Sequence, residues 1–185
     1  MIVMKFGGTS VADPAAIERL MAVERATRQA SGQPEAPDWR GPVVVVSALG
    51  GATDRFLAAA HEAGAGNSES AIAALEQLRT RHHDVAGVIG DSDERAEVDA
   101  FIDGQFDELV RLAGALAVLR DVTPRWLDTI AGAGELMSSR IIAAALTARG
   151  LAASWVDARQ VMVTGDEHMM ASPLGDCLVI DAQAL

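Results

Sequence analysis

Short apolar runs and longer stretches of helical periodicity alternate along the chain. Ile2–Phe6 predicts a strand that ends at two glycines, and the run VVVV at Val43–Val46 predicts a second strand. This second run is β-branched without polar alternation, which indicates a strand covered on both faces, as in a parallel sheet. Two further short strands are predicted near the end of the chain, at Ala152–Val156 and Val161–Thr164.

Apolar residues spaced three and four apart predict helices between these strands. Asp13 and Pro14 are a cap and a first helical residue for a helix that runs to about Gln29. Ser68 and Ser92 are candidate caps of two later helices. A loop rich in proline and glycine is expected at 31–42, and the remaining helices at about 55–63, 69–89, 92–119 and, as two separate helices, within 123–150.

Strands separated by helices indicate an α/β fold with a mainly parallel sheet. The two consecutive long helices at 69–119 are an excursion from strict alternation and could form a lid or a flank. A length of 185 residues suits one domain or part of a larger one.

Composition excludes several partner classes. The formal net charge is −11, which argues against nucleic acid and anionic membranes as partners. No apolar run approaches the roughly 20 residues that a membrane span needs. The only cysteine, Cys177, leaves no internal disulfide and fits a reducing cytoplasm. His82 and His83 are expected on a solvated helix face, and no metal-ligand spacing surrounds them.

Two loops that leave predicted strands have an unusual composition. KFGGTS (Lys5–Ser10) combines a lysine with glycines whose backbone N–H groups could approach phosphate oxygens, and Ser10 could add a hydroxyl donor. SALGGATD (Ser47–Asp54) carries the hydroxyls of Ser47 and Thr53 among small residues. Since ligands of open parallel sheets bind beyond the carboxyl ends of strands, both loops are candidate site elements. Ordinary strand-end turns are the alternative.

Glu135 is the third candidate, because it follows Gly132-Ala133-Gly134 and is expected to open a helix. A carboxylate in a first helical turn is favoured by the helix dipole alone. The functional alternative is a carboxylate that holds a substrate ammonium group. The chain has no GxxxxGK[ST] pattern, so it is not a P-loop kinase.

Three stretches, in order, resemble aspartokinases of the amino-acid kinase superfamily. KFGGTSV (Lys5–Val11) resembles their opening signature, and VVVVSALGGATDRF (Val43–Phe56) is similar to their second strand and substrate loop. GELMSSRIIAAALTARG (Gly134–Gly150) is similar to their Gly-Glu helix. The resemblance implies a three-layer αβα sandwich with a mainly parallel sheet.

The resemblance also implies the reaction, a phosphoryl transfer from ATP with Mg²⁺ to the side-chain carboxylate of L-aspartate. This reaction gives 4-phospho-L-aspartate and begins the route to lysine, threonine and methionine. In these roles Lys5 would face the transferring phosphate and act catalytically, and Glu135 would bind the substrate ammonium. Phosphate-loop contacts would come from Gly7, Gly8 and Ser10, and the aspartate site would be lined by Ser47 and Thr53.

One departure from the family pattern is large. Aspartokinases carry a later GGSD-type segment with a catalytic aspartate, then an adenine-binding region and ACT regulatory domains, and no such segments follow here. Residues 1–185 are therefore expected to be the amino-terminal, aspartate-side portion of a kinase domain, with little or no activity alone. The alternatives are another carboxylate kinase of the superfamily and a non-catalytic amino-acid-binding fragment. Uncovered apolar surface predicts a homo-oligomer or association with a missing half.

Overall fold

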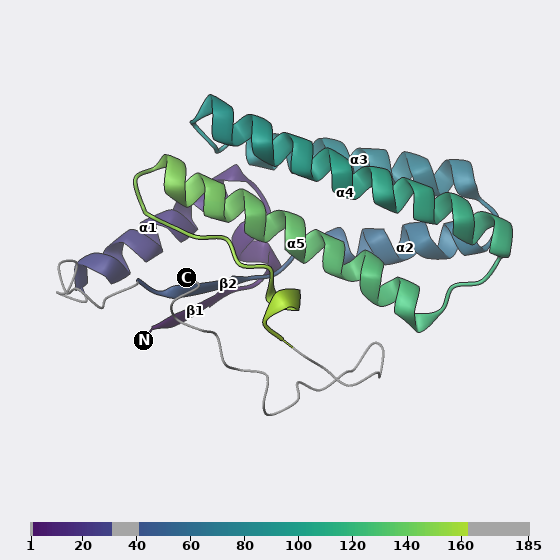
Figure 1. The fold of residues 1–185 in the computed structure, drawn as a ribbon, viewed down its shortest axis with the longest axis horizontal. Coiled ribbons are helices and arrows are strands. Elements are labelled where there is room, and N and C mark those ends of the chain that lie inside the picture. The colour runs from purple at the N-terminus through teal and green to yellow at the C-terminus, as the bar shows by residue number, and fades with distance from the viewer. Residues whose placement is uncertain (1, 31–40, 163–185) are drawn as a thin grey trace.

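A two-stranded parallel sheet forms one end of the molecule (Figure 1). The computed structural model describes residues 2–30 and 41–162. Strand β1 (Val3–Phe6) pairs with β2 (Val43–Val46), and their register aligns Lys5 with Val45. Helix α1 (Pro14–Ala30) lies between them in the chain, so the order β1, α1, β2 confirms the predicted α/β pattern with a parallel sheet.

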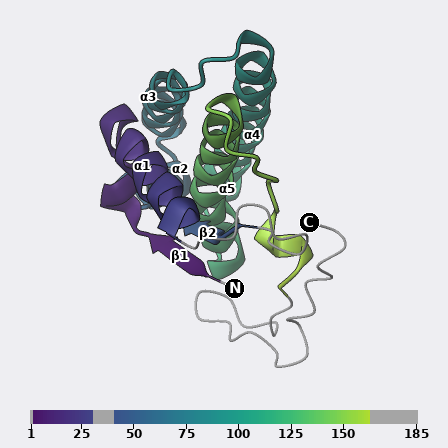
Figure 2. The same ribbon diagram turned by 90° about the vertical axis from the view of Figure 1, so that its left-hand side faces the viewer.

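The described helices cover one face of this sheet. Helices α1 and α5 (Pro124–Ala148) lie on the same side of the strands (Figures 1 and 2), and Met4 and Phe6 are half-buried. On the other face, the exposed fractions of Val3 and Val45 are 58% and 43%. The prediction that β2 is covered on both faces is therefore wrong for the described residues, which supply two of the three expected layers. The β-branched run signals burial on two faces, but no described element packs against the second.

Helix α1 begins where the sequence predicts. The Asp13 carboxylate accepts a hydrogen bond from the Ala16 backbone N–H (2.7 Å), and Pro14 is the first helical residue. A buried stripe at helical spacing then faces the rest of the protein: Ala16, Ile17, Leu20 and Met21.

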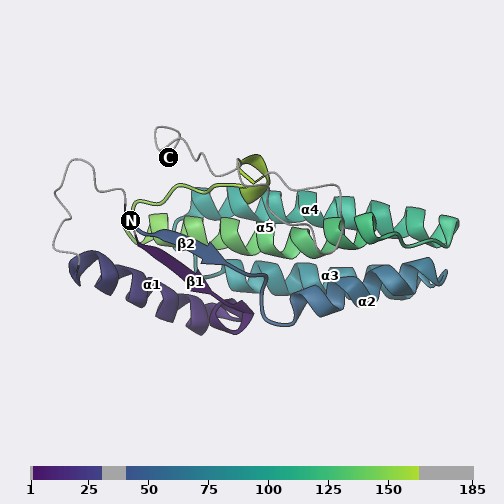
Figure 3. The same cartoon turned by 90° about the horizontal axis from the view of Figure 1, so that it is seen from below.

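Four helices form an elongated bundle that extends past one end of the sheet (Figure 3). They are α5 and three helices with the bounds α2 (Ala52–Gly64), α3 (Ser68–Ala86) and α4 (Ser92–Leu119). The predicted excursion of two long helices is thus confirmed. No helix among the described residues is both long and apolar enough to cross a membrane.

The helix starts correct two predicted caps. Asp91, rather than Ser92, caps α4, because its carboxylate accepts from the backbone N–H groups of Asp93 and Glu94 (3.0 and 2.9 Å). Asn67, rather than Ser68, precedes α3. Asn67 makes no side-chain hydrogen bond to the start of α3; its amide donates to Glu62 instead (2.9 Å).

Helix α5 is one continuous helix of 25 residues, which contradicts the two helices predicted within 123–150. Its start at Pro124 agrees with the Thr-Pro signature, but Gly132 and Gly134 lie inside the helix and do not end it. The reason is tertiary packing: a side chain at Gly134 would collide with neighbouring elements, as described below. Glu135 therefore lies in a helix interior and not in a first turn.

His82 is fully buried, so the predicted solvated position is wrong. Its ring packs between Phe56 of α2 and Phe106 of α4, with centroid distances of 6.0 and 5.3 Å. Its Nδ1 donates to the Leu78 carbonyl (2.7 Å). Burial lowers the pKa of His82 to about 4, because the charged form would lose its hydration.

His83 contacts α4. Its Nδ1 lies 2.7 Å from an Asp99 carboxylate oxygen, and its Nε2 lies 2.9 Å from one of Asp103. Burial opposes protonation, but hydrogen bonds to both carboxylates outweigh it and raise the pKa of His83. An imidazole that donates through both nitrogens must carry a proton on each, so this contact is an ion pair between α3 and α4.

The segment Ala152–Val156 is not a strand, because no described strand lies beside it. It packs on the helices instead. The Ala152 carbonyl accepts from Arg28 (3.0 Å), and the Trp155 indole N–H donates to Ser139 (3.0 Å). A short 3₁₀ helix, η2, follows at Ala158–Gln160. Residues 31–40, Cys177 and the end of the strand predicted at Val161–Thr164 lie outside the described residues.

Candidate active site

The two loops that follow the strands meet backbone to backbone. A Cβ atom on Gly8 would lie 3.1 Å from the Ala48 carbonyl oxygen and 3.3 Å from the Gly50 Cα. A Cβ atom on Gly50 would in turn lie 3.1 Å from the Gly8 carbonyl oxygen and 3.1 Å from the Ala12 Cβ. A Cβ atom at either position would be tighter than ordinary packing and would force the neighbouring loop to shift, so the first loop (7–12) and the second loop (47–51) pack as one unit.

The first loop leaves Lys5 and Gly7 accessible. Lys5 is exposed near the end of β1, and no ion pair joins it to another described residue. Gly7 precedes the short 3₁₀ helix η1 (Gly8–Val11), and its carbonyl accepts from the Ser10 N–H (2.9 Å). A Cβ atom on Gly7 would meet no described atom within 4 Å. Internal packing therefore does not require glycine at position 7, whereas close approach of a ligand would.

The second loop turns the chain from β2 into α2. The Ser47 N–H donates to the Phe6 carbonyl (3.1 Å), so hydrogen bonding between the strands extends into the loop. Gly51 has a φ of +73°, which favours glycine, and α2 begins at the next residue. Thr53, half-buried, is the second residue of α2. Ser47 thus lies directly after β2 beside the end of β1, and Thr53 lies in the first turn of α2.

Helix α5 brings Glu135 to the second loop. A Cβ atom on Gly134 would lie 3.0 Å from the Ala48 Cβ and 3.1 Å from the Phe56 ring, so the helix approaches both without a side chain between them. The hydroxyl of buried Ser138 donates to the Ser47 carbonyl (2.8 Å) and lies 3.1 Å from the Glu135 carbonyl oxygen. Glu135 is exposed next to this contact.

Two residues that hold the site were not singled out from the sequence. Ser138 ties α5 to the second loop, and Arg81 donates to the Ala12 carbonyl at the end of the first loop (3.0 Å). These pairs are 91 and 69 residues apart in the chain. No local motif predicts contacts at such separations; only the first serine of GELMSS, Ser138, was a visible signal.

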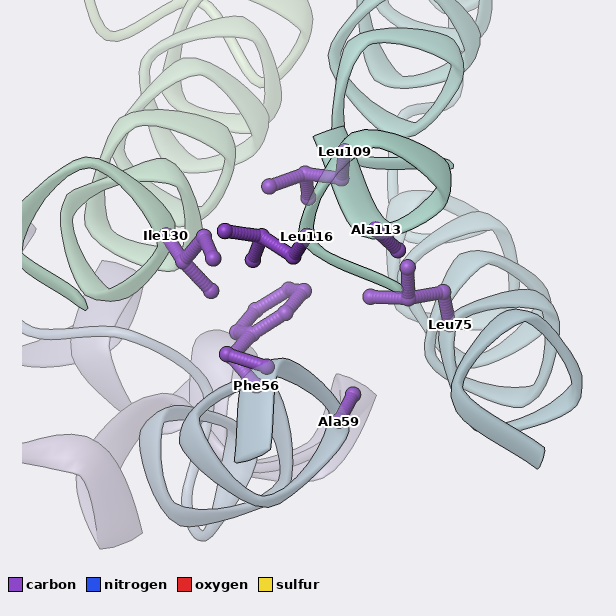
Figure 4. Close-up of a pocket in the computed structure, with 8 residues that line it drawn as sticks. Phe56, Ala59, Leu75, Leu109, Ala113, Leu116 and Ile130 are labelled. Carbon is purple, nitrogen blue, oxygen red and sulfur yellow. The ribbon is translucent and has the colours of Figure 1, made fainter. Parts of the chain in front are cut away.

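A small cavity in the helical bundle is separate from these loops. Figure 4 shows its apolar side chains, which come from α2, α3, α4 and α5 and include Phe56, Leu75, Leu116 and Ile130. Its volume of about 10 Å³ is at the lower limit for one water molecule, and the lining offers no polar partner. It is a packing gap. Among the described residues, no group of three acidic, histidine or cysteine side chains could hold a metal ion.

A family model for the amino acid kinase family matches residues 1–183. The chain belongs to the amino acid kinase family. This membership confirms the resemblance found in the three sequence stretches.

Aspartokinases are among the proteins that the chain is similar to. The chain is 32% identical over 176 residues to aspartokinase 3, chloroplastic, of Arabidopsis thaliana, covering 93% of this chain and 28% of that protein. It is 30% identical over 161 residues to the bifunctional aspartokinase/homoserine dehydrogenase 1, chloroplastic, of the same plant, covering 87% and 16%.

A solved amino acid kinase has the same fold. The structure of Escherichia coli aspartokinase III in complex with aspartate and ADP superposes with a TM-score of 0.76 at 27% sequence identity. The match covers 94% of this chain and 35% of that chain. The α/β class expected from the sequence is confirmed by this likeness, and the chain spans about a third of that relative's length.

Proposed function

We propose that the chain carries the phosphate-facing and aspartate-facing loops of an aspartate kinase. The enzyme transfers the γ-phosphoryl group of ATP to the side-chain carboxylate of L-aspartate. A bond forms between the carboxylate oxygen and the γ-phosphorus, the bond to the ADP oxygen breaks, and 4-phospho-L-aspartate results. This is the first step of lysine, threonine and methionine biosynthesis. The observation that carries the proposal is the Gly8–Gly50 contact, which unites the lysine loop with the hydroxyl loop.

The roles of the residues follow from their positions. The Lys5 ammonium group is exposed beside the first loop and would neutralise charge on the transferring phosphoryl group. Gly7, Gly8 and Ser10 would offer backbone and hydroxyl donors to phosphate oxygens. Ser47 and Thr53 would contact the substrate carboxylates, and Glu135 would hold the ammonium group. Lys5 is the residue to which we assign a catalytic role.

Magnesium would enter with the nucleotide. Mg²⁺ usually keeps several waters and binds through substrate phosphates with only one or two carboxylates. Such binding needs no dedicated protein cage, and no group of three acidic, histidine or cysteine ligands lies together among the described residues. Bound Mg²⁺ supplies charge compensation on the phosphates, and the protein residues position the two substrates.

The isolated chain is expected to bind aspartate but to transfer phosphoryl groups weakly or not at all. The support is its length: it spans 35% of the aspartokinase III chain that it matches. The exposed apolar sheet face at Val3 and Val45 also supports self-association or pairing with further kinase sequence. We place the protein in the cytoplasm, as its single cysteine suggests.

The decisive experiment is isothermal titration of the purified chain with L-aspartate, with and without MgATP, and with L-glutamate in parallel. We expect aspartate binding that Glu135→Gln reduces at least tenfold. Glu108→Gln, a matched change of an exposed α4 carboxylate, should leave it unchanged. Gly7→Ala should weaken nucleotide binding and retain aspartate binding, because the added methyl group meets no described atom.

Three results would contradict the proposal in different ways. Equal affinity for glutamate and aspartate would favour another carboxylate kinase of the family. Aspartate binding without any nucleotide binding would favour an amino-acid-binding fragment. A folded chain that binds neither ligand would refute the assignment of both loops for this chain.

A further inference from the structure

Arg81 reaches from the helical bundle to the first loop. It lies on α3, half-buried, and its Nη2 donates to the Ala12 carbonyl at 3.0 Å. Ala12 is the residue that follows η1, so the acceptor is the carbonyl at the end of the Lys5 loop. The Arg81 side chain thereby joins α3, the first of the two long helices, to the loop that bears the candidate phosphate donors.

The Ala12 end of the loop is also in contact with the second loop. A Cβ atom on Gly50 would lie 3.1 Å from the Ala12 Cβ, so the Ala12 methyl group lies close against the second loop. Gly8 contacts Ala48 and Gly50 at the other end. The first loop therefore contacts the second loop at both ends, Val11 anchors it in the core, and Arg81 adds a hydrogen bond from α3.

Arg81 differs from its neighbour Arg79 in its partners. Arg79 pairs with Glu76 and with two α4 carboxylates, Asp103 and Asp107. No carboxylate pairs with Arg81 among the described residues, and its hydrogen bond goes to a backbone carbonyl. A guanidinium group that donates to a carbonyl makes a charge-assisted bond, which is stronger than a neutral one.

The base from which Arg81 extends is rigid. The next residue, His82, is fully buried between two phenylalanine rings and bonded to the Leu78 carbonyl. His83 pairs with two α4 aspartates. Three consecutive side chains of α3 thus contact the first loop, the core and α4, which fixes the helix where the Arg81 bond originates.

We infer that Arg81 is a positioning residue: it holds the first loop, and with it Lys5 and Gly7, against the second loop. The claim that Arg81 holds the loop rests on its hydrogen bond to the Ala12 carbonyl. Its consequence for phosphate binding rests on the proposed function. The α3–α4 excursion is then part of the active-site framework and not an independent flank.

The test compares Arg81→Gln, Arg81→Lys and a matched control, Arg111→Gln, in the full chain. Arg111 is exposed on α4 and makes no hydrogen bond or ion pair with another described residue. Hydrogen exchange is followed at the Ser10 amide, which bonds to the Gly7 carbonyl, and MgADP binding is followed by calorimetry. Urea unfolding reports global stability.

In Arg81→Gln we expect exchange at Ser10 to accelerate about tenfold, since a hydrogen bond to a charged group is lost. Exchange in the cores of α4 and α5 should change only as much as the urea-derived stability of the whole chain changes. Arg81→Lys, which keeps one charged donor, should restore part of the protection. This variant carries the test if Arg81→Gln folds poorly. MgADP affinity should fall about tenfold in Arg81→Gln and stay unchanged in Arg111→Gln.

Unchanged exchange at Ser10 in the folded Arg81 variants would overturn the inference. So would acceleration that is uniform across the chain, because it would reduce Arg81 to a general stabilising contact. Faster exchange at Ser10 with unaltered MgADP affinity would support the positioning role and count against the phosphate-binding role of the loop.

Discussion

Replacing Gly134 with alanine adds one methyl group where α5 meets the second loop. The new Cβ would lie 3.0 Å from the Ala48 Cβ and 3.1 and 3.4 Å from two atoms of the Phe56 ring. Neither neighbour can yield easily: the Ala48 methyl is fixed to the loop backbone, and the Phe56 ring is fully buried. Gly132, two residues earlier in the same helix, offers a matched control, because a Cβ there meets nothing within 4 Å among the described atoms.

Two opposing effects set the magnitude. Alanine is favoured over glycine in a helix interior by about 1 kcal/mol, and this gain applies at both positions. Overpacking a tight contact costs about 1–3 kcal/mol, and this cost applies at Gly134 alone. Gly132→Ala should therefore stabilise the protein by up to about 1 kcal/mol. Gly134→Ala should be less stable than Gly132→Ala by about 1–3 kcal/mol and should weaken aspartate binding by displacing the second loop.

The assay is urea unfolding at 25 °C, monitored by circular dichroism, of both variants and the unmodified chain, followed by aspartate titration. A Gly134→Ala variant as stable as Gly132→Ala would refute the reasoning, because it would show that the loop and helix do not approach as closely as described. A stability loss without change in aspartate affinity would separate the packing from the proposed site.

Three further predictions concern the histidines and Ser138. Since burial lowers the pKa of His82 to about 4, the unfolded chain binds the extra proton between pH 6.5 and 4. Stability should fall over that window as the pH is lowered, by about 3 kcal/mol in total, and His82→Phe should remove this dependence. The pKa of His83 is raised, so its stabilising contribution should be complete below pH 6.5 and decline as the pH rises through the folded-state pKa; His83→Gln should abolish that decline. Ser138→Ala leaves the Ser47 carbonyl without its donor and should cost about 1–3 kcal/mol and lower aspartate affinity.

Each of these has its own discriminating result. Unfolding free energies measured from pH 4 to 9 would contradict the histidine predictions if His82→Phe kept the acid-side slope or if His83→Gln kept the alkaline-side decline. For Ser138, the matched change is Ser139→Ala, which removes the hydrogen bond from Trp155 instead. Both serine variants should lose stability, and an equal loss of aspartate affinity in the two would argue against a specific tie to the second loop.

Local patterns in the sequence determined most of the described elements and singled out the two candidate loops. The Asp13-Pro14 start of α1, both strands and the bounds of α4 followed from side-chain preferences within a few residues. The Lys5 and Ser47 loops stood out because lysine, glycine and hydroxyl residues at strand ends are an uncommon combination. The similarity to aspartokinases followed from the same stretches.

Tertiary structure decided what depends on contacts between distant segments. Gly132 and Gly134 resemble a helix break locally, yet α5 continues through them because the small residue at 134 permits close packing on Ala48 and Phe56. His82 looks polar in sequence, but the helix turns it into the core. The hydrogen bonds that hold the loops, from Ser138 and Arg81, join residues 91 and 69 positions apart. Propensity acts over a few residues, whereas these contacts exist only once the chain has folded, and they determine how the two loops meet.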